Sequence, residues 1–156
     1  MGSINFEKLD KLAELSVSTG VALQKGQNLL ITAPSDALPL VRLIAKHAYK
    51  AGAGLVTPFF SDSEITLARY KYASDESFDV AADWLYKGMG EAFDNNTARM
   101  AIAGEDPMLL SDMDPERVAR ANKANSKAYK PARERITQFD INWNIIAWPG
   151  LAWAKR

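Results

Sequence analysis

Residues that could bind a catalytic metal are scarce in this sequence. His47 is the only histidine, and the 156 residues include no cysteine. A hydrolytic metal site needs two or three histidine and carboxylate ligands in fixed geometry, with one coordination position open. One imidazole cannot form a His-Glu-x-x-His or His-x-His motif, and a site of carboxylates alone would favour magnesium or calcium. We therefore predict that His47 is a packed helix residue, and that this chain carries no catalytic residue and no metal ligand.

Motifs for nucleophilic attack and for phosphate binding are also missing. A catalytic serine sits on an exposed elbow such as Gly-x-Ser-x-Gly, and that motif does not occur. Ser35 lies between a predicted strand and a predicted helix, where either it or Asp36 would cap the helix. The Gly52-Ala53-Gly54 segment precedes a strand, whereas a phosphate-binding loop follows a strand and opens a helix. We interpret these residues as structural.

Two pairs of acids stand at positions that invite a catalytic interpretation. Glu105 and Asp106 follow a predicted strand, but Pro107 makes the segment an ordinary turn. Asp112 and Asp114 precede a helix, where carboxylates favour the positive end of the helix dipole. We predict turn and capping roles for both pairs.

The aromatic carboxyl-terminal stretch is the most distinctive part of the sequence. Trp143, Trp148 and Trp153 fall within eleven residues, and Phe139 precedes them. These rings could form the core of a terminal strand, or an interface, because tryptophan is enriched in large buried contacts. The alternation of a strand cannot place all of them on one covered face. We expect Trp153 in particular to pack against something outside this chain.

The elements that must position these residues alternate along the chain. Short apolar runs predict strands, and apolar residues at helical spacing predict helices. The expected strands are 28–33, 54–60, 97–103 and 143–148. The expected helices are 6–23, one opened by Ser35 or Asp36 and ended by Ala51, then 61–71, 76–95 and 114–130.

This alternation predicts an α/β fold of three layers, a mostly parallel sheet with helices on both faces, in a Rossmann-like topology. Pro58 places the second strand at an edge or exit of the sheet. The length predicts a single domain over residues 1–156. Only Pro149–Arg156 follow the last strand, although the loops after strand ends build the ligand crevice in such folds.

Composition and charge exclude several classes of partner. Nineteen basic and nineteen acidic residues cancel, so we expect neither a nucleic-acid nor a membrane partner. The first residues lack the basic and apolar regions of a signal peptide, and no apolar run approaches the length of a membrane span. We predict a cytoplasmic protein.

Several segments match, in order, those of a known enzyme family. The chain resembles the amino-terminal domain of the thermophilic-type metallo-aminopeptidases, the group that includes aminopeptidases S and T. The most distinctive matches are Ala-Tyr-x-x-Gly-Ala at 48–53 and the Asn-Trp…Pro…Trp-Ala tail that starts at Asn142. The other matching segments are Gly26–Ile31, Leu40–Arg42 and Ile102–Pro107.

The resemblance implies an exopeptidase that removes amino-terminal residues from peptides with a pair of divalent metal ions, zinc, cobalt or manganese. It implies a cytoplasmic homodimer whose metal ligands lie in a carboxyl-terminal domain downstream of this chain. No residue here matches a ligand position of the family. We therefore expect a truncated form or a proteolytic fragment, inactive alone, with an inter-domain contact at Trp143, Trp148, Pro149 and Trp153.

Two other functions stay open from the sequence alone. One is a non-catalytic, flavodoxin-like module that binds a small ligand at its strand ends. The first strand-to-helix turn is too short and too acidic to wrap the phosphate of a flavin. The other is a purely structural or interaction domain.

Overall fold

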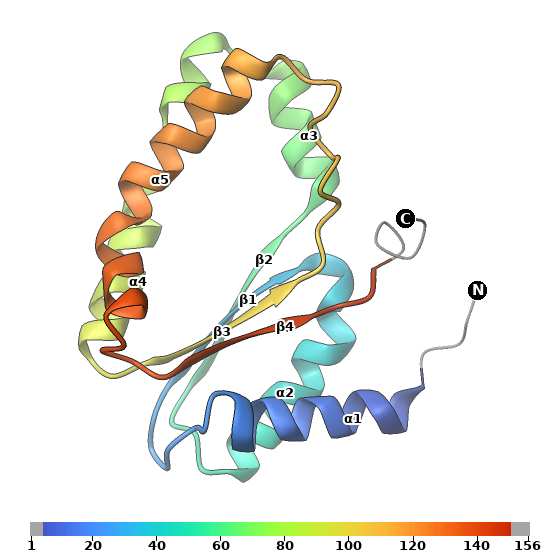
Figure 1. Cartoon of the computed structure of the whole chain (residues 1–156), viewed down its shortest axis with the longest axis vertical. Helices are drawn as coiled ribbons and strands as arrows, with labels where there is room; N and C mark the ends of the chain where they lie inside the picture. The colour runs from blue at the N-terminus through green and yellow to red at the C-terminus, as the bar shows by residue number, and fades with distance from the viewer. Residues whose placement is uncertain (1–4, 151–156) are drawn as a thin grey trace.

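A four-stranded parallel sheet forms the centre of the structure, a computed structural model that describes residues 5–150. Its strands stand in the order β2-β1-β3-β4 (Figure 1). All three neighbouring pairs are parallel, and the register sets Ile31 opposite both Pro58 and Met100. The strands are β1 (Leu29–Pro34), β2 (Val56–Ser61), β3 (Ala98–Ala103) and β4 (Trp143–Ala147).

Helices cover both faces of the sheet, as the alternating pattern predicts. On one face, α1 (Phe6–Leu15) and α2 (Leu38–Lys50) pack over β1 and β3, with Trp148 in the same cluster. On the other, α4 (Asp83–Asp94) and α5 (Pro115–Thr137) pack together (Figure 1). The predicted three-layer α/β fold is confirmed, and Pro58 does lie on an edge strand.

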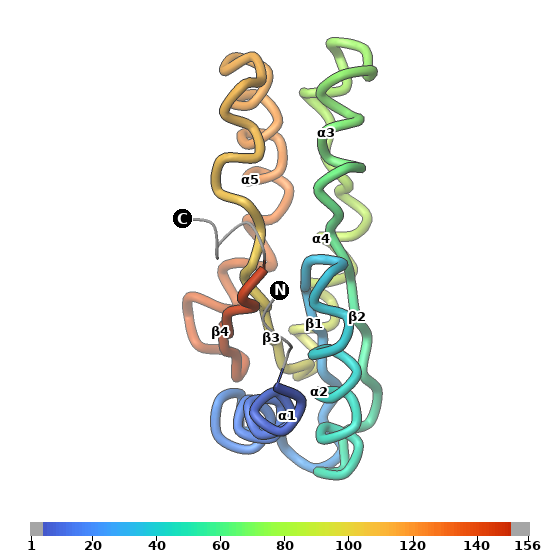
Figure 2. The backbone as a smooth tube through the Cα atoms, turned by 90° about the vertical axis from the view of Figure 1, so that its right-hand side faces the viewer, coloured from blue at the N-terminus to red at the C-terminus, as the bar shows by residue number. Residues whose placement is uncertain are grey.

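A third cluster lies away from the sheet. It joins α3 (Ser63–Tyr72), the short 3-10 helix η3 (Asp75–Asp79) and the first half of α5. Phe78 is fully buried there between Tyr70 and Ala121. Figures 1 and 2 show that these helices rise beyond the carboxyl ends of the strands, whereas α1 and α2 lie at the opposite end of the molecule.

The single helix predicted over 76–95 is wrong, because the structure divides it into η3 and α4. Arg69 interrupts the helix: its guanidinium donates to the carbonyl of Ser77, and also to that of Val80 at 3.0 Å. The break lets Phe78 enter the third cluster while Phe93 packs beneath the sheet.

Two predicted helix ends also differ from the structure. α5 runs through Pro131 to Thr137, beyond the predicted end at 130, and buries Ala132 and Ile136 against α4. The first helix ends at Leu15 and continues as a π-helical turn, η1, over Ser16–Gly20, short of the predicted residue 23.

No helix within residues 5–150 is both long enough and apolar enough to cross a membrane.

Candidate functional site

The carboxyl ends of the strands surround an open crevice, which we call the carboxyl-edge crevice. A hollow of about 450 Å³ lies over the ends of β1 and β3, lined by Thr32, Ser61 and the turn from Gly104 to Pro107. A neighbouring hollow of about 320 Å³ continues between Thr66 of α3 and Asn122 of α5. Open α/β sheets bind their ligands at this edge.

Ser35 and Asp62 join the ends of β1 and β2 across the crevice. The Ser35 hydroxyl donates to Asp62 Oδ2 at 2.7 Å. Asp62 Oδ1 accepts the main-chain N–H groups of Glu64 and Ile65, and so caps α3. These hydrogen bonds lower the pKa of the Asp62 carboxyl, because they favour its charged form, and the bond from the Ser35 hydroxyl contributes most.

A second link joins β2 to the turn after β3. The Ser61 hydroxyl donates to Glu105 Oε1 at 2.5 Å. Asp106 Oδ1 accepts the main-chain N–H of Met108 at 2.9 Å, which supports the turn predicted for this segment. Glu105 and Asp106 therefore bond to different partners, a serine hydroxyl and a main-chain N–H.

Asp36 anchors the aromatic tail. Trp148 Nε1–H donates to Asp36 Oδ2 at 3.1 Å, and the ring of Trp148 is buried against the core under α2. Neither Asp36 nor Ser35 caps the following helix, because η2 (Ser35–Ala37) leads into α2 without a side-chain cap. The predicted capping role is therefore wrong for both residues.

Two glycines let the chain segments approach closely beside Trp148. A Cβ on Gly104 would lie 2.9 Å from the carbonyl oxygen of Trp148, and one on Gly150 would lie 3.2 Å from that of Gly104. Both distances are shorter than ordinary van der Waals contact, so larger residues would push the tail away from β3.

The lone histidine lies on α2 and lines neither hollow of the crevice. His47 Nε2 is 3.0 Å from Asp10 Oδ1 of α1, and Lys46 Nζ donates to the same oxygen at 2.8 Å. The hydrogen bond from Lys46, which contributes most, and that with His47 lower the pKa of Asp10. His47 is thus a packing residue between two helices, in agreement with its predicted role.

The other acids and glycines take structural positions. Asp114 Oδ1 accepts the main-chain N–H of Glu116 and caps α5, as predicted, with Pro115 in the first turn. Gly52 closes α2 with φ +91°, a value that favours glycine. Gly54 packs so tightly that a Cβ would lie 2.6 Å from the side-chain oxygen of Asn28.

The residues predicted for an inter-domain contact divide between core and surface. Trp148 is buried and Trp143 is half-buried beside α5, whereas Pro149 is exposed. Trp153 lies outside the described residues. The structure leaves the inter-domain contact itself as a prediction.

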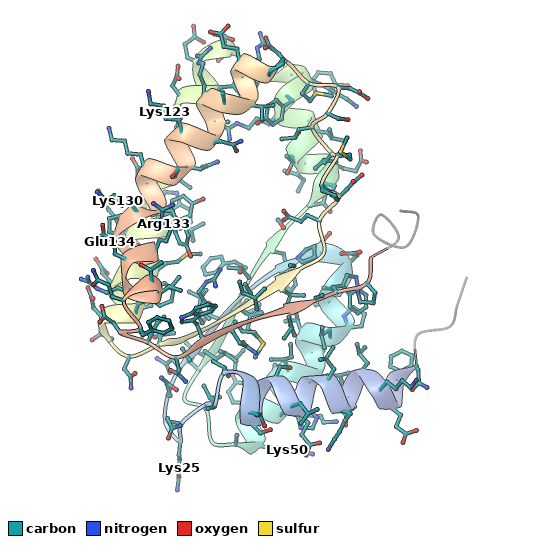
Figure 3. All side chains as sticks on the ribbon, viewed as in Figure 1. Lys25, Lys50, Lys123, Lys130, Arg133 and Glu134 are labelled. Carbon is teal, nitrogen blue, oxygen red and sulfur yellow. The ribbon has the colours of Figure 1, made fainter. Side chains whose placement is uncertain are left out.

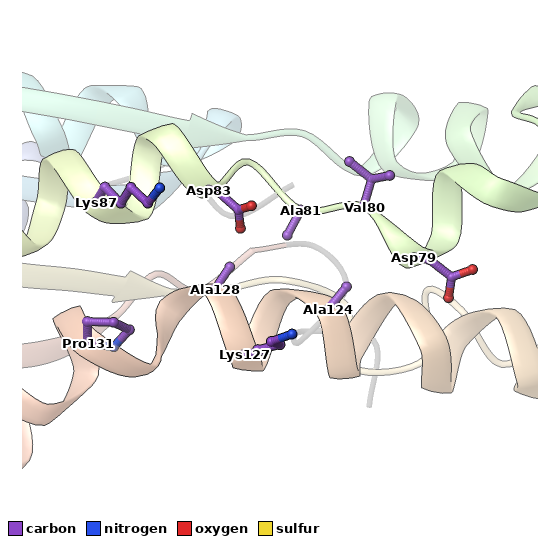
Figure 4. A pocket seen from close by; sticks show the side chains of 9 residues that line it. All are labelled: Asp79, Val80, Ala81, Asp83, Lys87, Ala124, Lys127, Ala128 and Pro131. Carbon is purple, nitrogen blue, oxygen red and sulfur yellow. The ribbon is translucent and has the colours of Figure 1, made fainter.

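A further hollow, of about 480 Å³, lies away from the crevice, between the start of α4 and the face of α5 (Figure 4). Its wall carries both acids and bases, Asp79 and Asp83 against Lys87 and Lys127. Asp79 is already paired with Arg120, so the hollow has no uniform charge with which to select a ligand. Figure 3 shows Lys123 and Lys130 on the outer side of α5, where both side chains are exposed.

No group of three histidine, cysteine or acidic residues within 5–150 could hold a metal ion.

The sequence did not predict the links from Ser35 and Ser61 to the acids across the crevice. A usable signal existed, since Asp36, Asp62 and Glu105 each lie within two residues of the end of a strand. Parallel strands bring such positions to one edge.

Comparison with known proteins agrees with this geometry. The profile of the thermophilic metalloprotease family (M29) matches residues 5–156. Aminopeptidase T of Thermus thermophilus is 46% identical over 147 residues, which are 94% of this chain and 36% of that protein. Aminopeptidase AmpS of Bacillus subtilis is 35% identical over 150 residues, which are 96% of this chain and 37% of that protein.

A solved structure gives the same result. Wild-type AmpT from Thermus thermophilus superposes with a TM-score of 0.93 at 45% identity, over 96% of this chain and 38% of that chain. The present chain therefore spans little more than a third of the length of the relatives it matches. With this match over nearly its whole length, the chain belongs to the thermophilic metalloprotease family M29.

Proposed function

We propose that this chain is the amino-terminal domain of a metal-dependent aminopeptidase, and that catalysis belongs to the part of the protein beyond Arg156. One observation carries the proposal: relatives named aminopeptidases match 94–96% of this chain with only 36–37% of their own length. The relatives that match this chain are named aminopeptidases, so they give no support to the alternative of a flavodoxin-like small-ligand module.

The donor set of residues 5–150 does not fit a metal pair. Asp62 is held by the Ser35 hydroxyl and two main-chain N–H groups, and Glu105 accepts the Ser61 hydroxyl. The one histidine, His47, is bonded to Asp10 between α1 and α2. The two divalent ions expected for the family, zinc, cobalt or manganese, would therefore be held by downstream residues.

The role left to this domain is to form one wall of the peptide-binding cleft. A third hollow at the same edge, of about 260 Å³, is lined by four acids, Asp36, Asp62, Glu105 and Asp106. The electrostatic field of this wall would favour the protonated amino terminus of a peptide. Peptides are thus the proposed substrates, reached through the catalytic part. A cytoplasmic location and a homodimeric full-length enzyme stay predictions.

Peptidase assays on two chain lengths test the proposal. The 156-residue chain and the full-length protein are each given a chromogenic amino-acid anilide with zinc, cobalt or manganese. We expect release of the amino-terminal residue by the full-length protein alone, and its loss after chelation. Metal-dependent release by the 156-residue chain, or none by the full-length protein under any of the three metals, would contradict the assignment.

A further inference from the structure

We propose that the outer edge of β4 and the apolar side chains beside it receive a helix and a fifth parallel strand from the downstream part of the full-length protein. The inference rests on the proposed function only in that the chain is the first part of a longer protein. It extends the α/β domain beyond residue 156.

The main chain of β4 presents one row of its hydrogen-bonding groups outward. The N–H of Arg99 donates to the carbonyl of Asn142 at 3.1 Å, and the N–H of Trp148 donates to that of Ala103 at 2.7 Å. Even-numbered residues of β4 therefore turn their N–H and C=O groups toward β3. Trp143, Ile145 and Ala147 turn theirs away, to a side where no strand lies in the described part of the chain.

The opposite edge of the sheet is closed to such pairing. The N–H of Leu29 bonds to the carbonyl of Leu55, so Val56, Pro58 and Phe60 of β2 face outward. The N–H of Val56 donates to the Tyr49 hydroxyl at 3.1 Å, and Pro58 has no N–H. Proline and local capping are how natural sheets protect a true edge.

β4 carries no comparable protection. Its five residues, Trp-Asn-Ile-Ile-Ala, include neither a proline nor a charge. An uncharged strand with a free row of main-chain groups is a template for another strand. The contrast between the two edges indicates that β2 ends the sheet and that β4 does not.

Apolar side chains mark the face on which the missing helix would pack. Trp143 contacts the cluster under α5, and the alternation of the strand places Ile145 on the same face. Ile145 is 57% exposed. Phe139 is 77% exposed, and its ring centroid lies 6.3 Å from that of Trp143. Together Phe139, Trp143 and Ile145 form an apolar patch beside α5.

Strand order and crossover handedness identify the occupant. The order β2-β1-β3-β4 is the first four positions of the doubly wound order 2-1-3-4-5. Crossovers between parallel strands are right-handed. A fifth strand beyond β4 would continue the direction of the step from β3 to β4, so its crossover helix would pack on the same face of the sheet as α5. That helix would lie over Ile145. A crossover needs about a dozen residues or more, and the relatives extend far beyond the matched part.

Hydrogen exchange on the two chain lengths tests the proposal. Exchange is followed by mass spectrometry on peptides that cover Trp143–Ala147, in the 156-residue chain and in the full-length protein. We expect the outward amides to exchange at least ~100-fold more slowly in the full-length protein. The amides of Arg99 and Ala101, inside the sheet, serve as controls that are protected in both.

A matched pair of variants tests the side-chain patch. Ile145→Lys should lower the melting temperature of the full-length protein and leave that of the 156-residue chain unchanged. Ile65→Lys, at a site on α3 that is 74% exposed, should leave both unchanged. An equal response of both chain lengths to Ile145→Lys would contradict the packing of a helix there.

Other outcomes also decide the question. Equal exchange of the β4 amides at both lengths would overturn the proposal, as would a native reading frame that ends at Arg156. Protection in the 156-residue chain that rises with its concentration would assign the edge to a second copy instead. An inactive full-length protein with a protected β4 edge would refute the proposed function and leave this inference standing.

Discussion

At the scale of single residues, the turn after β1 serves tertiary contacts that its local sequence does not reveal. Ser35 and Asp36 have the side chains of helix caps, yet they bond to Asp62 and Trp148, 27 and 112 positions away along the chain. Capping preferences describe local competition for main-chain N–H groups. A tertiary partner that is charged or buried can win that competition, and only the fold brings it near.

The anchor between Trp148 and Asp36 leads to a prediction about stability. Trp148→Phe keeps an aromatic ring in the core but removes the N–H that donates to Asp36. We expect the free energy of unfolding to fall by about 1–2 kcal/mol, because a hydrogen bond to a carboxylate and some packing are lost. Urea unfolding measures the change.

The matched control for this anchor is Trp84→Phe, since the side chain of Trp84 is 74% exposed. That substitution should change the free energy of unfolding by less than about 0.5 kcal/mol. If both substitutions have the same small effect, the Trp148 anchor contributes nothing to stability.

At the scale of elements, the sequence was most informative where a segment is buried on both faces or strongly amphipathic. The central strands and α2 were predicted within one or two residues, because apolar runs and helical periodicity follow directly from burial. The predicted element boundaries were wrong where long-range contacts determine them. Arg69 breaks the 76–95 segment, and packing against α4 carries α5 through Pro131.

The crevice was foreseeable in position but not in its contacts. Parallel strands fix which residues meet at the carboxyl edge, and Glu105 was expected there. Its partner Ser61 comes from a strand two positions away in the sheet, and no local pattern pairs the two. Such links depend on register and side-chain direction.

Pro131 gives a prediction at the scale of α5. It lies inside the helix, is exposed, and has no N–H for the carbonyl one turn earlier. Pro131→Ala should restore that bond and raise the free energy of unfolding by about 1–3 kcal/mol. Thermal and urea unfolding both report it.

The control for α5 is Pro115→Ala, in the first turn, where proline is well tolerated. Its effect should stay within about 0.5 kcal/mol. A loss of stability in Pro131→Ala would show that the proline fits a bend that the packing requires.

At the scale of the whole molecule, the described residues form two bodies of apolar contact rather than one. The first body is formed by the sheet and the helices that cover it, and it includes the fully buried Met100. The third cluster stands apart, built around Phe78, and Arg120 ties η3 to α5 through Asp75 and Asp79. These ion pairs raise the pKa of the Arg120 guanidinium, and the hydrogen bond with Asp79 contributes most. Exposed pairs of this kind contribute little stability, so Phe78 should hold this part together.

This division predicts that the two bodies open separately. Phe78→Ala removes a fully buried ring, which should destabilise its surroundings by about 3–5 kcal/mol. Because the third cluster shares few apolar contacts with the sheet, hydrogen exchange should accelerate in α3, η3 and the first half of α5 and stay slow in β1 and β3. Met100→Ala, within the sheet, should instead accelerate exchange in β1 and β3. Equal acceleration of the sheet in both variants would show instead that the whole chain unfolds as one unit.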